Sequence, residues 1–176
     1  MAVPIKTKLT WPVSLSEAKR HLRVYDEERE DDNYIQDLIY AATAKAEQYI
    51  GKDIAETNNT QQIYDYIDDS LYIKEGNFIS FTQAVTDASA LCTVDHVDTF
   101  YNYTYVEFTN SYDSDPLTIT YKTGFNEGEC PALIKQAILI KIADLYDVDR
   151  QSYLMGSLKE NKAFEALLNS FQQVIF

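Results

Sequence analysis

Two kinds of hydrophobic spacing divide this sequence into helix-forming ends and a strand-forming middle. Near both ends, apolar residues recur every three or four positions, as at Ile35, Leu38 and Ala42, which is the spacing of one helix face. Between residues 57 and 128, short aromatic and β-branched runs alternate with turn residues, a pattern typical of antiparallel strands. The sequence therefore predicts an α+β fold, a helical bundle core of about four helices with an inserted antiparallel β-sheet lobe.

Two helices are predicted before residue 52. Ser14 and Glu17 have the spacing of a capping box, in which each side chain bonds the other residue's backbone N–H, so a short helix should begin there. A long amphipathic helix is predicted over residues 32–50. Asp32 is expected to cap its start, and Gly51 is expected to end it in the left-handed conformation.

Charged and apolar residues also predict how the helices face the core. In the first helix, Lys19, Arg20 and Arg23 fall opposite the apolar positions, so we expect them on the solvent side. Pro131 suits the first turn of a third helix, where its missing N–H would have no partner in any case. The apolar residues of that helix cover most of its circumference, so it should be buried on more than one side. A last short helix is expected within residues 164–171.

The middle of the chain predicts an antiparallel sheet rich in tyrosine. Strands are expected over residues 63–67, 71–73, 78–81, 103–108 and 117–121. Many of the 14 tyrosines lie in these runs, and we expect them to form a half-buried core wall, with an interaction surface as the alternative. The predicted organisation is an N-terminal helical part over residues 1–56, a β-rich acidic insertion over 57–128, and C-terminal helices with an apolar tail over 129–176 that complete the helical core.

Negative charge is concentrated in the predicted insertion. The chain has a formal net charge of −13, and residues 53–130 account for −12 of it, because fourteen acids there face two lysines. Residues 1–25 sum to +4, whereas the short run 26–32 sums to −5. Affinity for a nucleic-acid backbone depends on Lys and Arg that displace counterions, so the middle segment is unsuited to phosphate binding. The alternative is that these acids only keep a β-rich surface soluble.

Catalytic and metal-binding patterns are weak in this sequence. Asp95, His96 and Asp98 would suit a metal, but alternating polar residues near a strand end or turn are much commoner. Cys92 and Cys130 lack metal-ligand spacing and form no disulfide framework, which fits synthesis in a reducing cytoplasm. No apolar run approaches the roughly 20 residues that cross a bilayer. The sequence therefore predicts no enzyme, no cofactor, no metal site and no membrane contact.

Several segments, taken in order, resemble one viral assembly family. They are residues 12–24, residues 32–51, Thr123-Gly124-Phe125, residues 131–139 and Ala143-Asp144-Leu145-Tyr146. Together they resemble the tailed-phage head-tail connector family, whose members are also called adaptor or head-completion proteins. The match covers both helical ends, and the strand-rich middle resembles the longer members in character.

The resemblance implies a structural virion protein at the neck, which would be in the host cytoplasm during assembly. Connectors of this kind form a ring of about twelve copies below the portal, a cyclic heterologous association. The ring extends the DNA channel and provides the surface on which the stopper or tail-completion protein docks. DNA would pass through the lumen without sequence-specific binding, and an acidic wall would offer its phosphates no ion partners.

The resemblance and the exposed character of certain residues predict three surfaces. Portal docking is expected at Phe171, Val174, Ile175 and Phe176, although Phe171 could instead belong to the monomer core. Subunit contacts are expected at Tyr34, Tyr40 and Tyr153. Channel-facing acids are expected at Asp26, Glu27, Glu28, Glu30 and Asp31, or within the acidic excess of residues 53–130.

Two other classes stay open at this point. One is a different neck or tail-completion protein, such as a stopper, although a mostly β stopper would lack two long helices. The other is a nonviral α+β protein-binding module that uses a tyrosine-rich face. Ring formation or association with a portal would favour the connector over the binding module.

Overall fold

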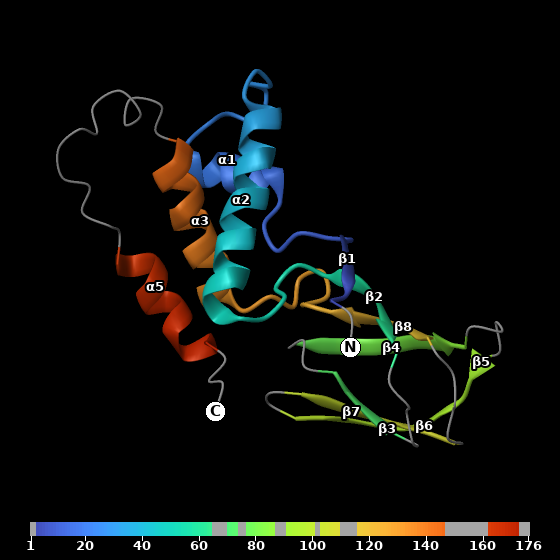
Figure 1. Cartoon of the computed structure of the whole chain (residues 1–176). Helices are drawn as coiled ribbons and strands as arrows, with labels where there is room; N and C mark the ends of the chain where they lie inside the picture. Colours follow the sequence, from blue (N-terminus) through green and yellow to red (C-terminus); the bar gives the residue numbers. More distant parts are fainter. Residues whose placement is uncertain are drawn as a thin grey trace. The chain divides into compact units, whose positions relative to one another are not determined.

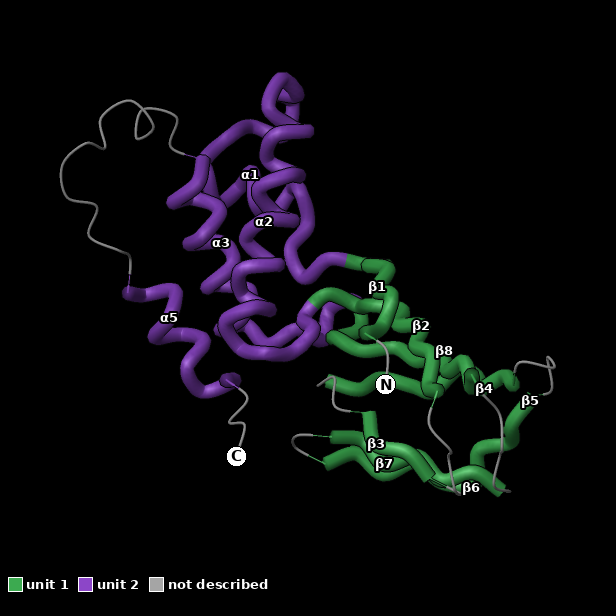
Figure 2. The backbone as a smooth tube through the Cα atoms, in the orientation of Figure 1, with its two compact units in different colours: residues 1–10, 55–126, 174–176 green, residues 11–54, 127–173 purple. Residues whose placement is uncertain are grey.

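Helices and strands separate into two units of this chain. The computed structural model describes residues 3–64, 70–73, 77–86, 91–100, 103–109, 116–146 and 162–172. The strand unit is formed by the described residues within 1–10 and 55–126, and the helical unit by those within 11–54 and 127–173, coloured green and purple in Figure 2. Among the described residues, four α-helices and two antiparallel sheets are present, which confirms the predicted α+β class (Figure 1).

The elements have the following bounds. The helical unit contains α1 (Leu15–Leu22), α2 (Asp32–Ile50), α3 (Ala132–Tyr146), α5 (Lys162–Leu168) and the 3₁₀ helix η1 (Asn169–Phe171). The strand unit contains β1 (Ile5–Lys8), β2 (Thr57–Ile63), β3 (Ser70–Ile73), β4 (Phe78–Val85), β5 (Leu91–Cys92), β6 (Val94–Thr99), β7 (Thr104–Phe108) and β8 (Leu117–Thr123).

Helix α3 is the centre of the helical unit. It packs against α2, α5 and α1, so neighbours cover it on more than one side, as its apolar circumference predicted. Ile134, Ile138 and Ile142 are buried along α3, and Ile35 and Ile39 are buried along α2. Full burial of such a side chain contributes about 1.5–3 kcal/mol. The two helical stretches, far apart in sequence, therefore share one core.

Both ends of α2 have defined backbone geometry. Gly51 adopts φ 74°, and its N–H donates to the Glu47 carbonyl at 2.9 Å, so the predicted left-handed end is confirmed. The prediction that Asp32 caps the start is wrong. Asp32 is the first helical residue, and the preceding Asp31 makes no capping bond with its side chain. The Asp32 carboxylate instead binds Lys19 of α1 at 2.7 Å.

The capping box of α1 is confirmed and makes the helix start sensitive to pH. The Glu17 N–H donates to Ser14 Oγ at 3.2 Å, and the Ser14 N–H donates to the Glu17 carboxylate at 2.9 Å. The bond from the Ser14 backbone lowers the pKa of Glu17 from its ordinary 4.5, against the opposing effect of partial burial, and Lys135 lowers it further.

We expect Glu17→Gln to destabilise the protein at neutral pH and to lose this effect in acid. A carboxyl whose pKa is lowered by folding stabilises the protein above its unfolded pKa, and that contribution disappears as the pH falls through the folded value. Urea unfolding of both proteins between about pH 7 and about pH 3 measures the difference. A deficit that stays constant over this range would contradict the expected role of the ionised Glu17.

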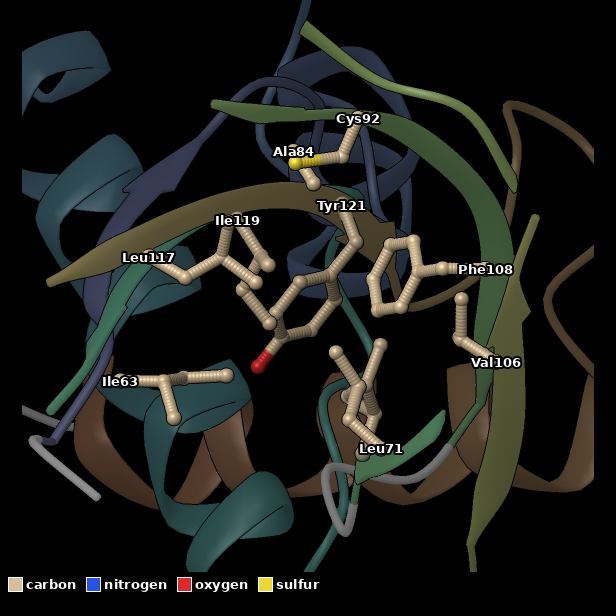
Figure 3. Close-up of a cluster of buried hydrophobic side chains, with 10 residues drawn as sticks. Ile63, Leu71, Ala84, Cys92, Val106, Phe108, Leu117, Ile119 and Tyr121 are labelled. Carbon is tan, nitrogen blue, oxygen red and sulfur yellow. The ribbon is translucent and has the colours of Figure 1, made fainter. Parts of the chain in front are cut away.

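The strand unit consists of two sheets packed face to face. The strand orders are β1-β2-β8-β4-β5 and β3-β7-β6, and each pairing is antiparallel. Figure 3 shows the buried cluster, to which both sheets contribute side chains: Ile63, Leu71, Ile73, Ala84, Cys92, Val106, Phe108, Leu117, Ile119 and Tyr121. Tyr121 is fully buried, as expected for a core wall. This layer is the hydrophobic core of the unit.

The structure adds strands that the sequence patterns did not predict. The five expected runs overlap β2, β3, β4, β7 and β8, whereas β1, β5 and β6 were missed. Residues 65–67 of the strand expected over 63–67 lie outside the described residues. His96, expected at a strand end or turn, lies inside β6.

Most of strand β2, residues 57–62, was not predicted because it is rich in polar residues that are buried by long-range pairing. Asn59 Nδ2 donates to Thr123 Oγ1 at 2.7 Å, and the Tyr121 hydroxyl donates to Gln61 Oε1 at 3.2 Å. Both bonds join β2 to β8, 60 or more residues later in the chain. Buried polar side chains are tolerated where such partners are present, and these partners exist only once the sheet has formed.

Candidate functional site: surfaces for assembly

The acidic loop, residues 26–31 between α1 and α2, is held in place by Lys19. The Lys19 side chain is only 3% exposed, and its Nζ donates to the Asp26 carbonyl at 3.1 Å, to the Glu28 carbonyl and to Asp32 Oδ1 at 2.7 Å. The prediction that Lys19 faces solvent is therefore wrong. Its ammonium group donates to three acceptors spread along residues 26–32, which satisfies the hydrogen-bonding requirement of a buried charge.

This arrangement leaves the predicted channel-facing acids on the surface. All five are exposed: Asp26, Glu27, Glu28, Glu30 and Asp31. Asp31 accepts a hydrogen bond from the Tyr146 hydroxyl at 2.8 Å, and this bond raises the pKa of Tyr146. Among the described residues, the other four carboxylates have no hydrogen-bond or ion-pair partner. The loop therefore presents several uncompensated negative charges on a fixed backbone.

The tyrosines predicted for subunit contacts lie at the surface of the helical unit. Tyr34 and Tyr40 are 37% and 38% exposed. The ring of Tyr40 lies 4.2 Å from that of Trp11, and the ring of Tyr34 lies 6.1 Å from that of Tyr146. Each of these tyrosines is thus partly exposed and also contacts a second aromatic ring, a geometry that suits a contact surface. Tyr153 lies outside the described residues.

The predicted portal-docking residues fall near the end of the described chain. Phe171 lies in η1 and is only partly buried, so it is not among the fully buried residues of the helical core. Nearby, Phe164 of α5 is buried and meets the ring of Tyr49 edge-on at 6.1 Å. Val174, Ile175 and Phe176 lie outside the described residues.

A fourth surface is a group of exposed and partly exposed aromatic rings on the small sheet β3-β7-β6, for which the sequence patterns left an interaction surface as the alternative to a core wall. We call Tyr72, Phe100, Tyr103 and Tyr105 the aromatic face. Ring centroids lie 5.5 Å apart for Tyr72 and Tyr103, 5.3 Å for Tyr72 and Tyr105, and 4.8 Å for Phe100 and Tyr103. Tyr72 and Phe100 are 51% and 50% exposed. The expected core wall is therefore wrong for these residues.

Strand register explains why these rings point away from the core. In β3 and β7, Leu71, Ile73 and Val106 are buried, so the alternate residues Tyr72 and Tyr105 belong to the opposite face. A strict alternation of Leu, Tyr and Ile in residues 71–73 is the signal that could have separated the two faces. Which face is covered depends on the second sheet, which the local pattern does not specify.

The candidate catalytic and metal-binding residues of the described part do not form a common site. His96 Nε2 lies 3.0 Å from Asp98 Oδ2, and both side chains are more than half exposed. Among the described residues, no group of three or more His, Cys, Asp or Glu side chains is arranged to hold a metal ion. Burial raises the pKa of the Cys130 thiol to about 11, which suppresses the reactive thiolate. None of the described helices has the length and hydrophobicity needed to cross a membrane.

Known structures share this fold. The chain is similar to one from the neck of an empty gene transfer agent (GTA) particle computed with C6 symmetry, with 14% identity and a TM-score of 0.76. It is also similar to one from the neck of a native GTA particle computed with C12 symmetry, with 13% identity and a TM-score of 0.75. Each alignment covers 98% of this chain and 97% of the other. At these identities, the likeness establishes the fold.

The sequence itself carries the family assignment. No curated protein sequence matches the chain. Residues 12–129 match the model of the family described as Phage gp6-like head-tail connector protein. This match covers well over half of the chain, from the start of the capping-box segment to the residues just before α3. The protein therefore belongs to the phage gp6-like head-tail connector family.

Proposed function

We propose that this protein is a non-catalytic structural component of a virion neck, where copies of it form a ring below the portal. The ring would extend the DNA channel and offer a docking surface to the stopper or tail-completion protein. A ring of about twelve copies agrees with the C12 symmetry of one neck that contains a similar chain. In this role the protein contributes shape and surface charge, and no covalent bond is made or broken.

The match of the connector family model to residues 12–129 is the main observation behind the proposal. The likeness of the fold to chains of GTA necks over 98% of its length supports it. The exposed surfaces support it. Cyclic assembly needs two different patches on each subunit, and the acidic loop, the helical tyrosines and the aromatic face are all exposed on the single chain.

Cryo-electron microscopy of particles that contain a tagged copy of the full chain tests the proposal. We expect the tag as a ring of density between the portal and the next neck component. A subunit absent from the neck, or present there as an isolated copy, would contradict the proposed function. Density beyond the ring, at the stopper position, would favour the alternative of another tail-completion protein.

The last residues are proposed to dock on the portal. Truncation after Gln172 removes residues 173–176 and keeps every described element. We expect the free energy of unfolding to change by less than about 0.5 kcal/mol, because every described helix and strand is retained, while binding to purified portal falls roughly tenfold or more. Ile5→Ser, which alters a side chain 74% exposed in the strand unit, is the control and should bind the portal normally. Normal portal binding by the truncated chain would reject this docking site.

The acidic loop is proposed to face the channel and to keep DNA mobile. The variant D26N/E27Q/E28Q/E30Q removes four charges but keeps Asp31, which binds Tyr146. We expect the wild type not to retain DNA in low-salt electrophoretic shift assays, and retention by the variant to be equal or stronger, since fewer negative charges oppose the phosphates. Tight DNA binding by the wild type, or weaker binding by the variant than by the wild type, would argue against electrostatic exclusion by this loop.

A further inference from the structure

The outer face of the small sheet combines aromatic rings with carboxylates. Strand register places Asp98 of β6 beside Tyr105 of β7, which itself lies beside Tyr72 of β3. The same register places Glu107 of β7 in the next outward-facing row. Glu107 has no hydrogen-bond or ion-pair partner among the described residues. His96 of β6 lies opposite Glu107 in the register, and its Nε2 lies 3.0 Å from Asp98 Oδ2. The aromatic face is thus bordered by two carboxylates, of which Asp98 shares one oxygen with the His96 imidazole.

A surface that combines aromatic rings with carboxylates is suited to a positively charged partner. Grouped exposed aromatic rings are enriched in binding surfaces, whereas scattered ones are ordinary. Two copies meeting through the same face would bring their carboxylates together, and that arrangement is repulsive. An arginine surface complements both features, because a guanidinium stacks on tyrosine rings and also donates to carboxylates.

The chain itself provides such a surface at the end of α1. Most lysines of the described part already have partners: Lys6, Lys8, Lys19, Lys45, Lys52, Lys122, Lys135 and Lys141. Arg20 in the last turn of α1 and Arg23, the residue that ends the helix in the left-handed conformation, are exposed and have no side-chain partner among the described residues. Of the other unpaired cations there, Arg29 lies within the acidic loop and Lys162 stands apart on α5. Arg20 and Arg23 are therefore the available cationic pair.

We propose that the aromatic face of one copy binds the Arg20–Arg23 end of α1 in the neighbouring copy. The proposal rests on the ring proposed above and names its subunit contact. Each copy would use its aromatic face on one neighbour and its arginine pair on the other, as a cyclic heterologous assembly requires. Tyr72 and Tyr105 would supply stacking area, while Asp98 and Glu107 would accept hydrogen bonds from the guanidinium groups.

A charge exchange tests this contact. We expect Asp98→Arg and Arg23→Glu each to weaken self-association roughly tenfold. The double variant should recover most of the loss, because an arginine at position 98 of one copy would then meet an acidic residue at position 23 of its neighbour. Self-association is measured by sedimentation equilibrium of the full chain and by ring formation on purified portal. Circular dichroism verifies that each variant is folded. Two additive losses without recovery would overturn the pairing.

An aromatic truncation provides a matched comparison. Tyr72→Ala should weaken self-association roughly tenfold or more. Tyr64→Ala is the control, because both tyrosines are 51% exposed and Tyr64 lies outside the aromatic face. Equal effects of the two substitutions would overturn the assignment of this face.

Disulfide crosslinking separates this inference from the proposed function. In Y103C/R20C, oxidation should link assembled subunits into a ladder of multimers, whereas each single variant should give none; the native Cys92 and Cys130 are buried. Rings without a ladder would overturn the inference and leave the connector role intact. A ladder in a protein absent from the neck would support the contact and contradict the proposed function. If the chain neither associates nor forms rings, both proposals fail.

Discussion

Lys19→Met is expected to lower the free energy of unfolding by about 3 kcal/mol. The methionine keeps most of the apolar stem but removes all three hydrogen bonds of the ammonium group, to the carbonyls of Asp26 and Glu28 and to the Asp32 carboxylate. Those acceptors would lose their shared cation inside a segment that is already rich in negative charge. Urea denaturation followed by circular dichroism measures the change.

Arg20→Met is the matched control for this prediction. It removes a positive charge from the next residue of the same helix, but Arg20 is exposed and has no side-chain partner in the described part. We expect a change within about 0.5 kcal/mol. Limited proteolysis should also cut residues 24–31 faster in Lys19→Met than in Arg20→Met. A loss below about 1 kcal/mol for Lys19→Met would show that water replaces the ammonium group.

Gly124→Ala is expected to destabilise the strand unit by about 3 kcal/mol or more, because it combines backbone strain with a steric clash. Gly124 has φ +99°, and a Cβ there would lie 2.2 Å from the Ala55 carbonyl oxygen. The obstacle is backbone, which cannot rotate away as a side chain would. The Gly124 N–H also donates to the Asn77 carbonyl at 2.8 Å, so any shift that relieves the clash strains this bond.

Gly128→Ala separates the two contributions. Gly128 also has a positive φ, +83°, but nothing lies within 4 Å of a Cβ added there. We expect a loss of about 1–2 kcal/mol from backbone strain alone. Thermal or urea unfolding of both variants gives the difference, which is the cost of the clash with Ala55. Equal losses for the two glycines would mean that the backbone near Ala55 moves aside at little cost.

Local signals predicted much of the helical unit from sequence. The Ser14–Glu17 capping box and the Gly51 helix end involve residues within four positions of one another, so a short window contains all the atoms that decide them. The burial of α3 on several sides also followed from its own apolar residues. The family resemblance rested on the same helical segments, and the family match confirms it.

Distant partners decided the features that the sequence patterns missed. Residues 57–62 of β2 have the local pattern of a polar loop. They form a buried strand because Thr123 and Tyr121 of β8 are hydrogen-bond partners for the side-chain amides of Asn59 and Gln61. The helix pattern alone predicts that Lys19 is exposed. It is buried because the carbonyls of Asp26 and Glu28 in the acidic loop accept hydrogen bonds from its ammonium group. The surface roles of Tyr34, Tyr40 and the acidic loop stay predictions, because they depend on contacts with other molecules.

The amino-acid sequence by itself determined the α+β class, the capped start of α1, the Gly51 end of α2 and the family, because periodicity and capping depend on a few neighbouring residues. Only the tertiary structure decided which side of each strand became core and which lysine became buried. Those outcomes depend on pairing between residues tens of positions apart, as when one sheet covers Leu71 and Val106 and leaves Tyr72 and Tyr105 on the outside.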